Sequence, residues 1–385
     1  MVAEHLRPGY DLAIVGAGIV GSVAAYLAAR ERPEWKIALL DRSLVGHGAT
    51  LYSGGLDHAY GVSAPQRTIA AESGALYRQI QDAVPGLPVY DLPLYGVVDA
   101  GRAREVMSRF THDGARIGTA DDLAQLRRSY PDLALAKGQV LLAGCPAAYG
   151  VATGVATGLV AHLQASAGLH CLEGAEVEGV EAVEGAYSLG LADGRTLHAL
   201  RVLMAGGPWM LRGPAAGVME AAGVRIKKVV AMHVSRVPTP DDPVVFFFDD
   251  DAFLLPLHHR GHWLFSFASE EWDCLPEVSS LRISAADRGR ALSILQRYAP
   301  SLVPLCQGGR AFCDAYTPGR LPLTERVPSS PGFVVAGGCS GSGFRLAPGI
   351  ARRALELLPG FAPAADPSQR PPAGTPTPPF PPPHP

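Results

Sequence analysis

The chain has 385 residues, of which 48% are hydrophobic and 18% are charged, and its formal net charge at pH 7 is −3. This length permits a large core and more than one domain, and the near-neutral charge does not indicate a nucleic-acid-binding protein. No apolar run approaches the roughly 20 residues that span a bilayer, and Met1 to Tyr10 has no hydrophobic stretch of the secretory kind. The six cysteines form no C-x-x-C pair. We therefore expect a cytoplasmic protein with reduced thiols.

The segment 11–22 predicts a strand, a glycine turn and a helix in direct succession. Gly16 permits the tight turn, Gly18 allows backbone N–H groups to approach a pyrophosphate, and Gly21 allows the helix to pack closely on the strand. A second apolar strand follows and ends in Asp41, twenty residues beyond Gly21, where its carboxylate can accept a hydrogen bond from a ribose hydroxyl. The order of these elements predicts a dinucleotide-binding site.

After a long loop rich in Gly, Ser and His at 43–61, helical and strand patterns alternate along the chain. The patterns predict helices over 66–84, 102–128, 149–167, 284–298 and 349–358, strands over 93–98, 228–234, 244–248, 253–257 and 262–267, and a hairpin over 177–191 followed by Asp193-Gly194. Two further strands run into glycines, at 201–209 and 333–344, which is where open α/β sheets bind ligands.

Four segments together resemble the FAD-dependent superfamily of D-amino-acid oxidase, glycine oxidase and monomeric sarcosine oxidase. They lie at 14–41, 46–61, 205–209 and 337–349. The resemblance implies an α/β fold, in which a Rossmann-like FAD-binding domain of the glutathione-reductase type is interleaved with an antiparallel-sheet substrate domain. It also implies that the terminal glycine loop closes over the isoalloxazine, which favours FAD over NAD.

The expected FAD domain is discontinuous and comprises 1–85, 145–222 and 311–360, while 86–144 and 223–310 form the substrate domain. The Pro-rich stretch 361–385 is expected to be a disordered or polyproline-like tail, or alternatively a segment that docks a protein partner. By the resemblance, the residues expected to bind FAD are Gly16, Gly18, Ile19, Val20, Gly21, Asp41, Arg42, Ala49, Thr50, Gly54, Gly55, Val177, Ala205, Gly206, Trp209, Gly341, Ser342, Gly343, Phe344, Arg345 and Leu346.

The sequence departs from this family at the residues that hold a substrate carboxylate. The arginine of glycine oxidase falls at or near Asp314, and Asp57 stands where sarcosine oxidase has an arginine before its His-Ala-Tyr-Gly segment. Arg345 replaces a lysine that sarcosine oxidase has after Gly-Phe, so it either binds a carboxylate or phosphate, or packs along the last helix. Asp57 and Asp314 either recognise a cationic group of the substrate or cap turns.

The sequence leaves two alternatives each for the electron acceptor and for the attachment of the flavin. Sarcosine oxidase has a lysine over the flavin, but the matching strand 262–267 has none, and Lys227 and Lys228 lie in an earlier strand and are not expected to replace it. We therefore expect either an oxidase or a dehydrogenase that uses another acceptor. Cys313 lies near the position at which sarcosine oxidase anchors FAD covalently, but its spacing to Tyr316 is one residue longer. Either a covalent link to FAD or a buried inert thiol is therefore expected there.

The leading functional hypothesis is an FAD-dependent oxidoreductase that oxidises the C–N bond of a small amine or amino-acid-like molecule to an imine. Tyr316 and Arg345 would orient the substrate, and Asp57 or Asp314 would bind a cationic group or assist deprotonation. One alternative is a 2-hydroxy-acid or alcohol dehydrogenase with His58 as general base, and another is an inactive flavin-binding partner subunit. No nucleic acid, membrane or metal partner is expected, although three histidines lie close together in sequence, at positions 258, 259 and 262.

Overall fold

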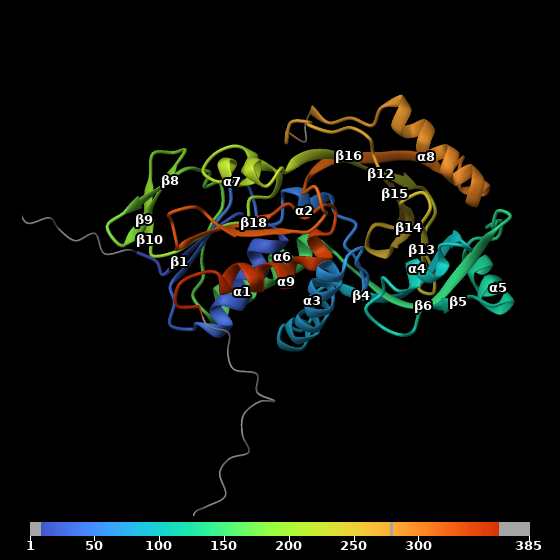
Figure 1. Cartoon of the computed structure of the whole chain (residues 1–385), viewed down its shortest axis with the longest axis horizontal. Coiled ribbons are helices and arrows are strands. Elements are labelled where there is room, and N and C mark those ends of the chain that lie inside the picture. The colour runs from blue at the N-terminus through green and yellow to red at the C-terminus, as the bar shows by residue number, and fades with distance from the viewer. Residues whose placement is uncertain (1–8, 278–279, 362–385) are drawn as a thin grey trace, which may run out of the picture.

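The computed structural model describes residues 9–277 and 280–361, and two large sheets organise this part of the chain (Figure 1). The first sheet has the strand order β17-β18-β11-β1-β2-β7, in which all neighbours are parallel except the edge strand β17. All residues of β1, β2, β11 and β18 are buried, as expected for strands that are covered on both faces. The strands are β1 (Leu12–Val15), β2 (Ile37–Leu40), β7 (His170–Leu172), β11 (Val202–Met204), β17 (Leu323–Arg326) and β18 (Phe333–Gly337).

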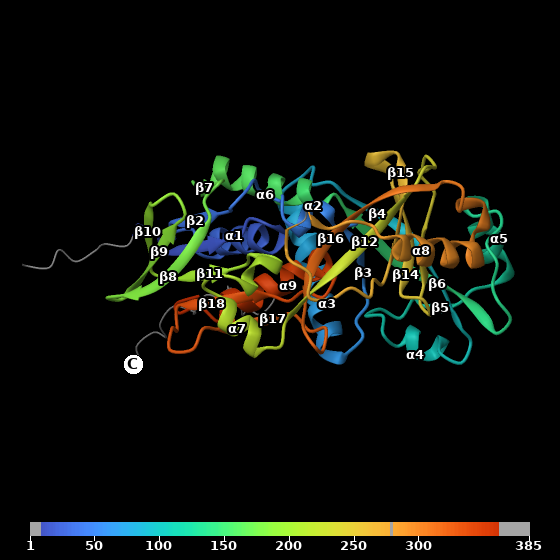
Figure 2. The same cartoon turned by 90° about the horizontal axis from the view of Figure 1, so that it is seen from above.

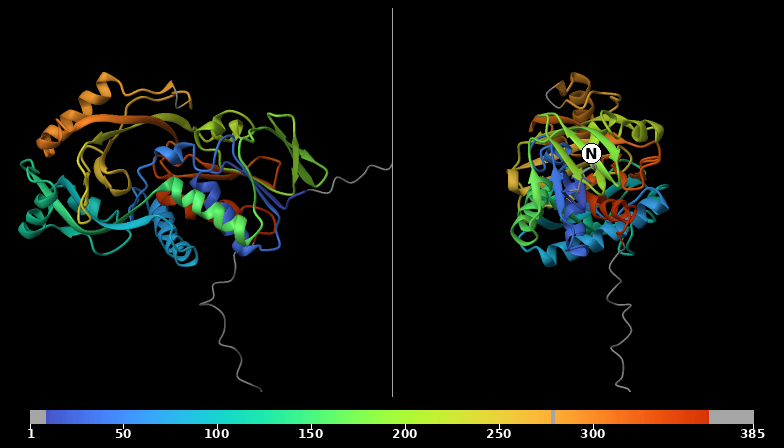
Figure 3. Two further views of the ribbon diagram at one scale, coloured as in Figure 1. Left: turned by 180° about the vertical axis from the view of Figure 1, so that it is seen from behind. Right: turned by 90° about the vertical axis from the view of Figure 1, so that its left-hand side faces the viewer.

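Four helices pack together on one face of this sheet and form a continuous apolar core with it. Figure 3 shows α6 beside α1, as seen from behind. The short side chains of α1 allow these close contacts, because ten consecutive residues from Ile19 to Ala28 are buried. The helices are α1 (Ile19–Glu31), α3 (Ala64–Ala83), α6 (Ala152–Ser166) and α9 (Gly343–Glu356).

The other face of the first sheet is covered by a small antiparallel sheet and two short helices. The expected hairpin is in fact a three-stranded meander, in which the Asp193-Gly194 turn leads into a third strand. Figure 2 shows this small sheet at one end of an elongated molecule. Its strands are β8 (Val177–Val183), β9 (Ala186–Leu191) and β10 (Thr196–Ala199), and the helices are η1 (Gly207–Leu211) and α7 (Ala216–Ala221).

The second large sheet has nine strands and lies toward the opposite end of the molecule. Its order is β16-β12-β15-β14-β13-β4-β6-β3, with β5 paired to β6, and only β4 and β13 are parallel neighbours. The strands are β3 (Leu56–His58), β4 (Val89–Asp99), β5 (Arg116–Ile117), β6 (Gln139–Gly150), β12 (Arg225–Val234), β13 (Val244–Phe247), β14 (Ala252–Leu257), β15 (His262–Phe267) and β16 (Cys306–Tyr316).

The outer face of the nine-stranded sheet packs against α5 and α8 in a core of its own. Alternation along β12 explains which residues enter this core, because Val230 and Met232 point into it while Ala231 between them belongs to the core on the other face. The remaining elements of this half are α2 (Ala49–Tyr52), α4 (Ala103–Met107), α5 (Ala120–Ser129), η2 (His258–Arg260), α8 (Ala285–Tyr298) and η4 (Pro300–Leu302). None of the described helices is both long and apolar enough to cross a membrane.

Two helices differ clearly from those expected from the sequence, and two of the expected domain limits lie within strands. The single helix expected over 102–128 is divided into α4 and α5, because Thr119 and Asp122 form a capping box that starts a new helix. The domain limits expected at 144/145 and 310/311 fall inside β6 and β16 respectively, so these long strands carry the second sheet up to the first. The last helix begins at Gly343 and not at Gly349.

Helix α9 contains a proline, and α3 satisfies the backbone groups that this leaves free. Pro348 has no N–H to donate to the carbonyl of Phe344, four residues earlier. That carbonyl instead accepts a hydrogen bond from the Tyr77 hydroxyl at 2.6 Å, and the Gly349 N–H donates to Ser73 Oγ at 3.0 Å. The position of the first turn of α9 is therefore fixed by α3.

Candidate active site

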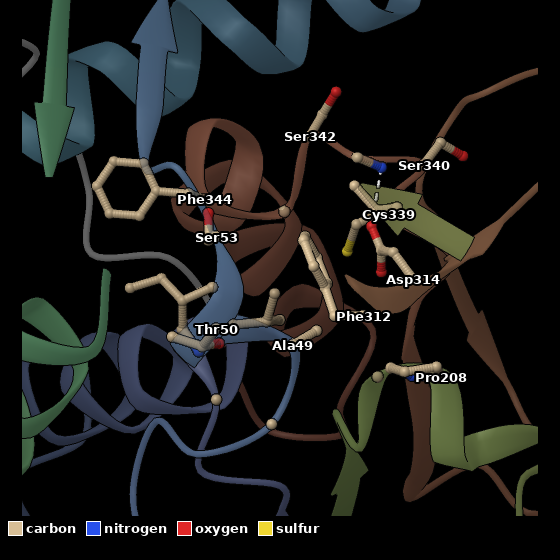
Figure 4. Close-up of a pocket in the computed structure, with 18 of the residues that line it drawn as sticks. Ala49, Thr50, Ser53, Pro208, Phe312, Asp314, Cys339, Ser340, Ser342 and Phe344 are labelled. Atoms are coloured by element: carbon tan, nitrogen blue, oxygen red, sulfur yellow. Dashed lines mark hydrogen bonds between the residues drawn. The ribbon is translucent and has the colours of Figure 1, made fainter. Parts of the chain in front are cut away.

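A cavity of about 970 Å³ lies between the two large sheets and is lined by residues from both. It extends from the glycine turn after β1 and the end of β2 to the start of α9 and the inner face of β12 and β16. Its volume is at the upper end of the range for small-molecule and cofactor sites, which is roughly 300–1,000 Å³. Figure 4 shows part of this cavity, with α2 on one side and the loop before α9 on another.

The glycines at the β1 end have the close approaches that the motif requires. Gly16 has φ +105, and a Cβ there would lie 2.5 Å from the carbonyl oxygen of Ala205. A Cβ on Gly21 would lie only 1.8 Å from the carbonyl oxygen of Gly16. Gly21 therefore packs behind the turn, whereas Gly16 and Gly18 line the cavity at the N-terminus of α1, where helix N–H groups favour a phosphate.

Asp41 organises the backbone around this turn. Its two carboxylate oxygens accept hydrogen bonds from the N–H groups of Ala17 and Ser43, each at 2.8 Å. Burial raises the pKa of Asp41, while these two hydrogen bonds act in the opposite direction. The hydroxyl of Thr50 in α2 accepts from the N–H of Ile19 at 3.0 Å, so α2 is tied to the first turn of α1.

At the other end of the cavity, Asp314 holds the loop that precedes α9. Its carboxylate accepts hydrogen bonds from the N–H groups of Gly341 and Ala315, both at 2.8 Å, and Figure 4 shows it beside Cys339. Burial raises the pKa of Asp314 to about 6, against the effect of the two N–H donors. Both oxygens are thus already engaged by the backbone, which is the turn-capping role considered for this residue.

Arg345 is buried in the first turn of α9, with 8% of its surface exposed. It donates to Ser342 Oγ at 2.8 Å, and its Nη1 lies 3.0 Å from His58 Nε2. Its Nε is buried and has no hydrogen-bond partner among the described residues. Burial and the adjacent Arg345 hold the pKa of His58 well below its usual value, so His58 is neutral and its ring accepts from the guanidinium.

Aromatic side chains of the second sheet line the cavity beside His58. Phe246 packs against both His58 and Phe253, with ring centroids 5.7 and 5.6 Å away, respectively. Phe312 stacks on Tyr52 at 5.6 Å. These rings supply an apolar surface that excludes water, which strengthens electrostatic interactions between a bound molecule and the buried guanidinium.

Most residues expected from the sequence line this cavity. Tyr316, Asp314 and His58 do so, as do nearly all of the expected FAD-binding residues, from Gly16 to Arg345. Two expected FAD-binding residues do not: Gly21 packs behind the glycine turn, and Leu346 lies in the helical core. Cys313 points into the core on the far side of β16, between the cavity-lining Phe312 and Asp314, so its thiol does not face the cavity.

Asp57, which the sequence suggests as a substrate-binding residue, does not face the cavity either. Alternation along β3 places Leu56 and His58 toward the cavity and Asp57 away from it, near Tyr77 of α3. Burial raises the pKa of Asp57 to about 6, while the positive charges of Arg345 and Arg78 act in the opposite direction. Asp57 therefore lies behind Arg345 and acts on it only as a nearby charge.

The raised pKa of Asp57 predicts a pH-dependent stability effect. The folded state favours the protonated carboxyl, so this contribution to stability is present below about pH 4 and is lost as the pH rises through about 6. Asp57→Asn resembles the protonated form, so we expect it to be more stable than the wild type at pH 7.5 by about 2–3 kcal/mol. Denaturant unfolding at pH 4 and pH 7.5 measures this, with the exposed Asp82→Asn in α3 as control. A stability difference that is the same at both pH values would contradict the assignment.

The sequence did not identify Lys227 as a site residue. It belongs to β12, lines the cavity and is 7% exposed. The signal that could have indicated it is the rarity of lysine in this chain, where only Lys36, Lys137, Lys227 and Lys228 occur. The face of the sheet on which the Lys227 side chain lies depends on the register of β12 against β16. This register pairs Lys227 with Asp314.

The fold and the cavity together define a class of protein, in which a Rossmann-type dinucleotide site is joined to an apolar cavity beneath a second sheet. The cradle of Gly16 and Gly18, in which a Cβ would meet backbone or the Thr50 hydroxyl, fits the phosphates of a dinucleotide. The cavity also continues beyond this cradle to Tyr316 and Arg345. The residues present therefore fit a long cofactor such as FAD.

The chain belongs to the family of FAD dependent oxidoreductases, whose family model matches residues 11–357. It is 23% identical over 364 residues to N-methyl-L-tryptophan oxidase from Yersinia pestis (strain Pestoides F), covering 88% of this chain and 92% of that protein. Glycine oxidase from Geobacillus kaustophilus has a TM-score of 0.72 at 22% identity, covering 90% of this chain and 94% of that one. L-proline dehydrogenase from P. horikoshii has a TM-score of 0.76 at 17% identity, with coverages of 91% and 94%. The predicted fold class, the family and FAD as the cofactor are confirmed.

Proposed function

We propose that this FAD-dependent oxidoreductase oxidises the C–N bond of a small amine that carries a carboxylate, giving an imine. The observation that carries the proposal is the buried Arg345, which faces the cavity and retains an unused Nε donor. A planar guanidinium binds a carboxylate through two hydrogen bonds, so Arg345 can fix the substrate by its acid group. The amine and amino-acid oxidases among the relatives support this choice of substrate class.

In this proposal the protein orients the substrate and excludes water, and the bound flavin supplies the hydride acceptor. Arg345 holds the carboxylate, while Ser342 and His58 hold Arg345. Tyr316 lines the same cavity, and burial together with nearby carboxylates raises the pKa of its hydroxyl, so it remains a neutral hydrogen-bonding group. Its role is to orient the substrate.

The structure gives less support to oxidation of a hydroxy acid or alcohol. That reaction needs a general base with a pKa near the working pH, and the sequence suggests His58 for this role. The pKa of His58 lies well below its usual value, and its ring already accepts from Arg345. The cavity is also lined by a charged arginine and is not filled by side chains, which argues against an inactive flavin-binding subunit.

Anaerobic mixing of the FAD-loaded protein with amines, amino acids and hydroxy acids tests this function. We expect at least one carboxylate-bearing amine to bleach the visible flavin absorbance and the matched hydroxy acid to leave it unchanged. Bleaching by hydroxy acids alone would favour the alternative reaction, and bleaching by no compound in the panel would favour an inactive subunit. Readmission of air then shows whether oxygen accepts the electrons, which decides between an oxidase and a dehydrogenase.

A cytoplasmic location is part of the proposal. All six cysteines have free thiols, which is typical of proteins in a reducing compartment. The expected protein-docking role of the Pro-rich tail falls almost entirely outside the described residues, because the described part ends at Phe361.

A further inference from the structure

Lys227 is a second buried cation in the cavity, and it comes from a different element from Arg345. It lies on β12 and is paired in register with Asp314 of β16. Because neighbouring residues in register share a face of the sheet, Lys227, Asp314 and the cavity-lining Val229 all face the same side. The side chain is 7% exposed, which is unusual for a lysine.

The ammonium group of Lys227 has aromatic neighbours, and none of the described residues gives it a counter-ion. Its Nζ lies 4.9 Å from the ring centroid of Trp272 and 5.2 Å from that of Tyr316. Within residues 9–277 and 280–361, no carboxylate oxygen lies within 4.0 Å of it. Lys228, the next residue, shows the contrast, because it forms ion pairs with Glu271 and with Asp287.

Nearby carboxylates are already engaged elsewhere. Asp314 binds two backbone N–H groups, and Asp251 pairs with Arg320 at 3.7 Å. Burial lowers the pKa of Lys227, as expected for a cation that has lost water without gaining an opposite charge. Aromatic faces attract a cation more weakly than a buried carboxylate does, so they do not fully replace such a charge.

The other cationic side chains around this part of the cavity have partners. Arg102 pairs with Asp249 at 2.8 Å, and Arg109 pairs with Glu105. Among the described residues that line the substrate end, Lys227 and Arg345 are the cations with no carboxylate within 4.0 Å. Their positive charges can be neutralised together by one molecule that carries two anionic groups.

We propose that Lys227 binds a second carboxylate of the substrate, so that the substrate is an amino dicarboxylate held between Arg345 and Lys227. This inference rests on the proposed function and makes its substrate class more specific. The sequence suggested a cationic substrate group, whereas this inference makes that group anionic. Asp57 does not line the cavity, and both carboxylate oxygens of Asp314 accept from backbone N–H groups. Trp272 and Tyr316 position the ammonium and leave its N–H donors free for a carboxylate.

Calorimetric binding of carboxylates to the FAD-loaded protein tests the role of Lys227 without turnover. Succinate, glutarate and adipate are compared with butyrate, pentanoate and hexanoate, which have the same chain lengths and lack the second carboxylate. We expect at least one dicarboxylate to bind about tenfold or more tightly than its matched monocarboxylate, because a charge-assisted hydrogen bond contributes this much. Lys227→Met should reduce that ratio to about one, and Lys227→Arg should retain most of it.

Arg225→Met is the matched control, because Arg225 is also a cation over the Trp272 ring but is exposed and pairs with Asp273. It should keep the wild-type ratio. A wild-type ratio near one at all three lengths, or an unchanged ratio in Lys227→Met, overturns the inference. Monocarboxylate binding that depends on Arg345 but not on Lys227 leaves the proposed function standing. A ratio that depends on Lys227 in a protein whose flavin no amine bleaches would instead contradict the proposed function.

Discussion

Arg345→Met is expected to lower the second-order rate constant of anaerobic flavin reduction about a thousandfold, while the protein stays folded and retains FAD. The loss follows from the two charge-assisted hydrogen bonds that the guanidinium can give a carboxylate, each contributing about 1.5–3 kcal/mol. Methionine fills most of the arginine volume, so the apolar packing of the first turn of α9 is largely kept. Stopped-flow absorbance with the best amine from the panel measures the effect.

Two companion variants separate substrate binding from folding. Arg353→Met removes a cation from the exposed side of the same helix, where Arg353 pairs with Glu72, and should leave the rate constant unchanged. Removing Arg345 also removes a positive charge near the buried Asp57, so Asp57→Asn combined with Arg345→Met should regain any lost stability but not the lost rate. A rate constant within a few-fold of the wild type in Arg345→Met would show that Arg345 only packs along the helix.

Gly21→Ala is expected to yield a protein that binds FAD at least about a hundredfold more weakly and is purified largely colourless. The added Cβ would lie 1.8 Å from the carbonyl oxygen of Gly16, so the helix and the glycine turn must separate. Such a shift moves the helix N–H groups away from the phosphates that they bind. Visible absorbance of the purified protein and titration with FAD measure the loss.

Gly289→Ala provides the same chemical change at a position where no atom of the described residues lies within 4 Å of the new Cβ. Gly289 is inside α8, so alanine there should preserve FAD binding and stabilise the helix by about 1 kcal/mol. Full FAD binding by Gly21→Ala would show that the turn can rearrange without loss of its function. If both variants lost FAD, the loss would have to be ascribed to a general instability of the fold.

The dinucleotide half of the site could be predicted from the sequence because its signals are local. Gly16, Gly18 and Gly21 lie within six residues, and their roles depend on the backbone of one strand–helix turn. Asp41 follows at the end of the next strand, so its place at the same edge of the sheet is set by the parallel pairing of β1 and β2. FAD as the cofactor agrees with the dinucleotide site that these local signals predict.

The substrate half could not be predicted to the same extent, because it depends on strand register. Asp57 and His58 are adjacent in sequence, but one faces α3 and the other faces the cavity. A shift of one residue would exchange them. Lys227 and Asp314 are 87 residues apart, and only the pairing of β12 with β16 brings them together. The hydrogen bonds that occupy Asp314 also come from backbone N–H groups, which no side-chain pattern indicates.

The hydrogen bonds between α3 and the proline-containing turn of α9 have a consequence for how this site can change. The carbonyl that Pro348 leaves free is held by Tyr77, and the residue that follows this carbonyl is Arg345. The hydrogen bond that holds the backbone next to Arg345 is therefore made by Tyr77 of α3, whose side chain does not line the cavity. Substitutions in α3 at residues that do not line the cavity can move the guanidinium relative to the aromatic side chains of the second sheet. The residues that line the cavity then stay the same. The range of substrates can thus change through substitutions outside the cavity as well as through substitutions of the residues that line it.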